Sequence, residues 1–146
     1  MVRISYDDFV ADDHVQFDVP SIDQVLDTMV IGNGIGMKEI TTFGAFPFCG
    51  YPWNLFVLES YCRRFSSKYK YDCITPNSRN GGAIIKKACN LSFHDIMVES
   101  VARSKVNLNK KDVYDYLIDS GLMIRRQYND IERLINEAKA LREGRN

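Results

Sequence analysis

Apolar residues recur along the chain with the spacing of amphipathic helices, in which one face packs against a core. The first stripe follows Ser21, and Ser21 with Gln24 has the spacing of a capping box. Ser92 and Asn109 stand directly before two further stripes, in the place of helix caps. These patterns predict five helices, at residues 21–31, 53–66, 92–103, 110–120 and 130–143.

Short segments between the stripes have the character of β-strands or connectors. Residues 83–88 and residues 122–128 are rich in strand-forming side chains and are bounded by turn residues, so we expect a strand at each. Residues 15–19 alternate apolar and polar side chains, which predicts a further half-buried strand. Residues 32–36 have glycine at alternate positions but lack the strand-then-helix setting of a phosphate-binding loop. We therefore interpret them as a flexible linker.

The predicted elements describe an α+β fold that is mostly helical. Residues 1–50 form an acidic N-terminal segment with one helix and a connector rich in glycine and aromatic residues, and residues 51–146 form a second unit. From residue 53 the expected order is helix, strand, helix, turn, helix, strand, with GAIIKKA, SFHDIMVESVARS, NKKDVYDYLIDSG and LMIRRQY as its last four main elements. This order resembles the winged-helix variant of the helix-turn-helix domain, over about residues 53–128.

The resemblance implies that the helix starting at Asn109 is a recognition helix, with its first residues nearest the bases of a nucleic acid. Basic pairs on the two strands would neutralise phosphates. The candidate nucleic-acid contacts are Lys86, Lys87, Asn109, Lys110, Lys111, Tyr114, Arg125 and Arg126. Three aspartates on the same helix oppose this interpretation, because carboxylates repel a phosphate backbone.

The charge of the chain is unevenly distributed, although its formal sum is zero. Residues 1–50 contain two basic and eight acidic residues, a net charge of −6, and the remaining residues carry +6. This asymmetry indicates an acidic segment lying on a basic body, or a basic body that meets an anionic partner. Ordinary solvated faces would give the same sums.

Composition excludes several classes of protein. No run approaches the roughly 20 apolar residues of a membrane-spanning helix, so we expect no membrane association, and the acidic start lacks the pattern of a signal peptide. Cys49, Cys62, Cys73 and Cys89 include no close pair, which indicates free, mostly buried thiols of a reducing compartment and not a zinc site. We expect a cytoplasmic protein with no metal and no cofactor.

Residues 43–53 are the most unusual stretch, with five aromatic side chains and two prolines. The rings either pack as a structural loop that anchors the N-terminal segment, or form an exposed surface for a partner. The candidate partner contacts are Phe46, Phe48, Tyr51 and Trp53.

No motif of the chain predicts catalysis. Cys89 and His94 are close in sequence but have no surrounding motif, and the aspartates of residues 7–13 lack the spacing of a calcium loop. We therefore expect a non-enzymatic protein-interaction module without a small-molecule substrate, such as a domain of a larger protein or assembly, which binds another protein or a second copy of itself. The alternative is a winged-helix regulator that binds nucleic acid.

Overall fold

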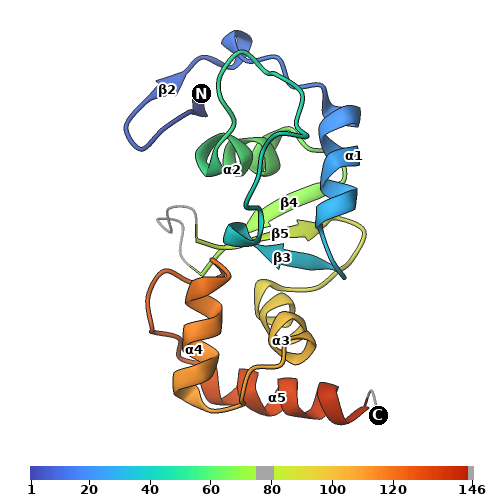
Figure 1. Cartoon of the computed structure of the whole chain (residues 1–146), viewed down its shortest axis with the longest axis vertical. Helices are drawn as coiled ribbons and strands as arrows, with labels where there is room; N and C mark the ends of the chain where they lie inside the picture. Colours follow the sequence, from blue (N-terminus) through green and yellow to red (C-terminus); the bar gives the residue numbers. More distant parts are fainter. Residues whose placement is uncertain (75–80, 145–146) are drawn as a thin grey trace.

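The computed structural model describes residues 1–74 and 81–144 of the chain. Figure 1 shows a small sheet across the middle of the molecule, with helices on both sides of it. The described residues form five α-helices and two antiparallel sheets, which confirms the predicted α+β class. The helices are α1 (Val19–Met29) and α2 (Leu55–Arg64) on one side of the sheet, and α3 (Phe93–Arg103), α4 (Lys110–Asp119) and α5 (Ile131–Gly144) on the other.

The central sheet joins distant parts of the sequence. Its strand order is β3 (Gly34–Gly36), β5 (Ala83–Lys86) and β4 (Tyr69–Asp72), with both pairs antiparallel. Residues 34–36 lie in the segment that the sequence analysis separates from the rest of the chain. That N-terminal segment therefore shares its sheet with residues beyond position 51.

The middle strand β5 contributes to a hydrophobic core on each face of the sheet. Ile84 packs with side chains of α1 and α2, whereas Ala83 and Ile85 pack with α3, α4 and α5. This alternation follows from the geometry of a strand, in which successive side chains point to opposite faces. Because both faces of β5 are covered, Ala83, Ile84 and Ile85 are all fully buried.

A second, two-stranded sheet lies beside α2. Strands β1 (Val2–Arg3) and β2 (Phe9–Val10) form a hairpin, whose Val2 packs in a third cluster with Val15, Cys49 and Val57. The hairpin is held at α2 by a hydrogen bond of 2.8 Å, which the Asn54 side-chain amide donates to the Ile4 carbonyl.

The helix predictions are confirmed, with ends that shift by up to two residues. Helix α1 starts two residues earlier than predicted, because Asp18 and not Ser21 is its N-cap: the Asp18 carboxylate accepts a hydrogen bond from the Ser21 backbone at 3.3 Å. Ser92 caps α3 and Asn109 caps α4, as their positions predict. Within the described ranges 1–74 and 81–144, no helix has the length and apolarity needed to cross a membrane.

The predicted strand at residues 122–128 is wrong. These residues are irregular, and the neighbours of β5 in the sheet are β3 and β4. Leu122 and Met123 are buried in the core beside α3, so these apolar side chains fill the core from an irregular segment and not from a strand. Residues 122–128 therefore supply no wing strand, and the winged-helix resemblance stays a prediction.

Two further predictions about local structure are wrong. Residues 15–18 are not a strand, and α1 already begins at Val19; the Gln16 amide donates to the Cys49 carbonyl at 2.9 Å without forming a ladder. The predicted flexible linker, residues 32–36, contains strand β3. Its glycines permit close approach, because an added Cβ at Gly34 would lie 2.9 Å from the Ile84 carbonyl oxygen.

Candidate functional site

The aromatic loop of residues 43–53 has a buried side and an exposed side. Phe46 is 6% exposed and stacks on Trp53, with ring centroids 4.7 Å apart. Tyr51 is half-buried against the cluster that contains Val2 and Cys49. Phe48, in contrast, is 79% exposed. Of the four predicted partner contacts, Phe48 is the ring that the fold displays, and Phe46 belongs to the core.

The backbone on both sides of Phe48 is fixed by hydrogen bonds. The Trp53 indole donates to the Pro47 carbonyl at 2.7 Å, and the Cys49 carbonyl accepts from the Gln16 backbone at 2.9 Å. Phe48 is thus an exposed ring between two anchored neighbours.

A second group of exposed rings lies on the N-terminal hairpin, and the sequence analysis did not single it out. Tyr6 is 53% exposed and Phe9 is 52% exposed. The Arg3 guanidinium lies over both rings and over Phe56, at 5.6, 5.5 and 4.8 Å from their centroids. We call Arg3, Tyr6, Phe9 and Phe56 the N-terminal patch. The hairpin and the aromatic loop lie at the same end of the molecule, far from α4 and α5 (Figure 1).

The predicted nucleic-acid contacts on α4 already have protein partners. Lys110 forms an ion pair with Glu132 at 3.0 Å, and Lys111 lies 3.5 Å from Asp115. Asp115 also pairs with Arg126. Glu132 and Asp115 therefore compete with a phosphate backbone for these three cations.

The other residues of this predicted set divide between structural roles and exposed positions. The Asn109 side chain accepts from the Asp112 backbone at 2.8 Å as the helix cap, and the Tyr114 hydroxyl donates to the Tyr128 carbonyl at 3.4 Å. Arg125 is exposed.

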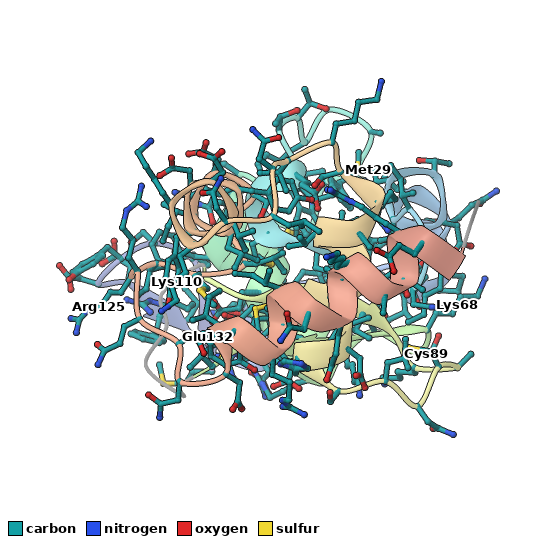
Figure 2. The ribbon with its side chains drawn as sticks, turned by 90° about the horizontal axis from the view of Figure 1, so that it is seen from below. Met29, Lys68, Cys89, Lys110, Arg125 and Glu132 are labelled. Carbon is teal, nitrogen blue, oxygen red and sulfur yellow. The ribbon has the colours of Figure 1, made fainter. Side chains whose placement is uncertain are left out.

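Lys86 and Lys87 belong to a different part of the surface. The Lys87 ammonium donates to the Ser66 carbonyl at 2.7 Å, and the Lys87 backbone amide donates to the Lys68 carbonyl at 2.8 Å. In Figure 2, Lys68 lies at the opposite side of the molecule from Lys110 and Arg125. The structure therefore places the eight predicted nucleic-acid contacts in two separate groups.

His94 has partners that are distant in sequence. Its Nδ1 lies 2.5 Å from the Tyr128 hydroxyl, and its Nε2 lies 2.9 Å from a Glu137 carboxylate oxygen. Cys89 donates instead to the Lys86 carbonyl at 3.1 Å. Both ring nitrogens of His94 are thus engaged by groups other than the Cys89 thiol, and the network links α3 to α5.

Asp23 is a buried carboxylate, 1% exposed, which the sequence analysis also missed. Its two oxygens accept five hydrogen bonds, from the hydroxyls of Tyr61, Ser66 and Ser67 and from the backbone amides of Ser67 and Lys68. Burial raises the pKa of Asp23, but these hydrogen bonds outweigh it, so the net pKa lies below the usual value. Such a fully bonded group is structural in character.

The acidic residues near the N-terminus do not assemble a metal site. Asp12 forms an ion pair with Arg64 at 2.8 Å and with the N-terminal amine at 3.1 Å. Hydrogen bonds from these cations hold the pKa of Asp12 well below its usual range. Among residues 1–74 and 81–144, no group of three or more histidine, cysteine, aspartate or glutamate side chains could hold a metal ion.

Comparisons with protein-family models, with curated proteins and with solved structures find no match for this chain. Functional interpretation therefore depends on the geometry of the exposed rings and on the distribution of charge.

Proposed function

We propose that this chain is a non-enzymatic protein-interaction module, and that Phe48 anchors its protein partner. The observation that carries the proposal is the exposure of Phe48, 79%, between two backbone positions that are held by hydrogen bonds. Aromatic anchors contribute strongly to protein interfaces. A ring on a fixed backbone loses less conformational entropy on binding than one on an unrestrained loop.

The nucleic-acid alternative has less support from the geometry. Lys110, Lys111 and Arg126 each pair with a carboxylate, which reduces the counterion release that drives binding to phosphates. The cytoplasmic location expected from the cysteines stays a prediction.

Site-specific photo-cross-linking tests the proposal. The photoreactive residue p-benzoylphenylalanine is placed at Phe48, or at Ile31, an equally apolar position that is 60% exposed in the loop after α1. In cells that express the protein, we expect discrete cross-linked species from position 48 and none of these species from position 31. A cross-link between two copies would identify the partner as a second copy.

The matched substitutions Phe48→Ser and Ile31→Ser complete the test. Because both side chains are exposed, we expect both variants to keep the wild-type circular dichroism spectrum. Proteins that co-purify with wild type should be lost with Phe48→Ser and retained with Ile31→Ser. Retention of the same proteins by Phe48→Ser would overturn the proposal.

A further inference from the structure

We infer that the N-terminal patch docks a basic segment of a partner protein, an inference that rests on the proposed interaction function. The patch displays two rings that stay half-exposed although Arg3 lies over them. Exposed aromatic rings bind guanidinium and ammonium groups through their faces.

The rings of the patch are held in place by their own loop. The Arg3 Nε donates to the carbonyls of Ser5 and Tyr6, at 3.1 Å each, and so ties the guanidinium to the hairpin turn. The Tyr6 ring meets the Phe56 ring edge-on, with centroids 6.4 Å apart. The patch is therefore preorganised, which lowers the entropic cost of binding.

Charge around the patch identifies the chemistry of the partner. Asp7 and Asp8 lie in sequence between the two exposed rings, and both are exposed. Residues 1–18 contain five aspartates, of which Asp12 is the one with an ion pair in the described part of the chain. The surplus negative charge beside aromatic faces is complementary to arginine or lysine side chains.

A second copy of the chain would have to bind this surface through its basic residues 51–146, and that fit is poorer than the fit of a different protein. Lys110 pairs with Glu132, Lys111 and Arg126 share Asp115, and Arg133 pairs with Asp130 at 3.3 Å. A partner segment with unpaired cations would not have to break such pairs first. We therefore assign the patch to a basic segment of another protein.

Peptide binding to the full chain tests the inference. The probes are fluorescein-labelled 12-residue peptides of alternating arginine and glycine, or of alternating glutamate and glycine. Anisotropy titrations are made at low and high salt, and amide chemical shifts locate the binding site. We expect the arginine peptide to bind, with shifts concentrated at residues 3–10 and 56, and the glutamate peptide not to bind. Added salt should weaken the complex.

Two charge variants sharpen the test. Asp7→Asn with Asp8→Asn should weaken binding of the arginine peptide by at least about threefold, because two exposed attractions are lost. Asp119→Asn is the matched control, since Asp119 is exposed on α4 at the other end, and it should leave the affinity unchanged. Unchanged amide spectra outside residues 3–10 verify that the fold is intact.

Several results would overturn the inference. These are equal affinity of both peptides, equal affinity of the two charge variants, or shifts located on α4 and α5. Sedimentation that shows self-association, abolished by the Asp7 and Asp8 substitutions, would replace the basic partner with a second copy. If a partner cross-links at position 48 and its affinity is unchanged by Asp7→Asn with Asp8→Asn, the proposed function stands and this inference alone is overturned.

Discussion

At the scale of single residues, Asp23 links three parts of the molecule. It lies on α1, and its carboxylate accepts from Tyr61 on α2 at 2.6 Å and from Ser66 in the turn after α2, also at 2.6 Å. The backbone amide of Lys68, just before β4, donates to the same carboxylate at 3.1 Å. Each donor would be left unsatisfied if the acceptor were lost, and unsatisfied buried donors are costly.

Substitution of Asp23 by asparagine should therefore destabilise the protein. An amide offers one acceptor oxygen where the carboxylate offers two, and its NH₂ group would face donors. We expect Asp23→Asn to lower the free energy of unfolding by about 2–3 kcal/mol, measured by urea denaturation at pH 7. Asp119→Asn, at an exposed position, should change it by less than about 0.5 kcal/mol. Equal stability of Asp23→Asn and wild type would contradict the role of this network.

The same carboxylate predicts a dependence of stability on pH. The pKa of Asp23 is lower in the folded protein than its ordinary value, so its ionised form stabilises the fold above about pH 4. This stabilisation is lost as the pH falls through the folded-state pKa. The difference in unfolding free energy between wild type and Asp23→Asn should accordingly shrink as the pH falls below about 4. A difference that is constant over this range would show that protonation of Asp23 does not matter.

At the scale of elements, β3 depends on the absence of a side chain at Gly36. A Cβ at this position would overlap the Ser120 carbonyl at the end of α4, and the neighbouring Lys38 amide donates to that carbonyl at 3.0 Å. We expect Gly36→Ala to lower the unfolding free energy by about 1–3 kcal/mol, because backbone atoms must move apart. Gly44→Ala is the control, since no atom lies within 4 Å of its added Cβ. Denaturation curves of the two variants provide the comparison, and equal curves would be the contrary result.

Helices were more predictable from the sequence than strands, for reasons visible in single residues. Ser92 and Asn109 act through neighbours three positions away, so their capping roles can be deduced locally. The pairing of Ile35 with Ile84 joins positions far apart in the chain, and no local pattern specifies it. Leu122 and Met123 have apolar side chains that fit a strand or a buried irregular segment equally well, and they lie in an irregular segment.

The candidate site was predictable in part. The composition of residues 43–53 drew attention to Phe48, but it could not separate that ring from the buried Phe46, because both are phenylalanines beside Pro47. Tyr6 and Phe9 stand in an acidic stretch without periodicity, so no sequence signal marked them as a patch. Their grouping depends on Arg3 and on Phe56 from α2.

At the scale of the whole molecule, the two hydrophobic cores on opposite faces of the central sheet should unfold together. Trp53, the one tryptophan, packs against the core formed by α1 and α2, whereas the opposite core contains α3, α4 and α5. Because β5 belongs to both cores, we expect tryptophan fluorescence and helical circular dichroism to change at the same urea concentration. Separate midpoints would indicate that the core of α1 and α2 and the core of α3, α4 and α5 unfold independently.

The alternation of Ile84 and Ile85 also limits how β5 can vary in length. The two neighbouring side chains fill opposite interiors. One residue inserted between Ala83 and Ile84 without a compensating bulge would turn the side chains after it to the opposite faces of the sheet, so that Ile84 and Ile85 faced the wrong sets of helices. Changes of chain length can be absorbed in the connections around this strand, but within it only exchanges of one side chain for another keep both interiors filled.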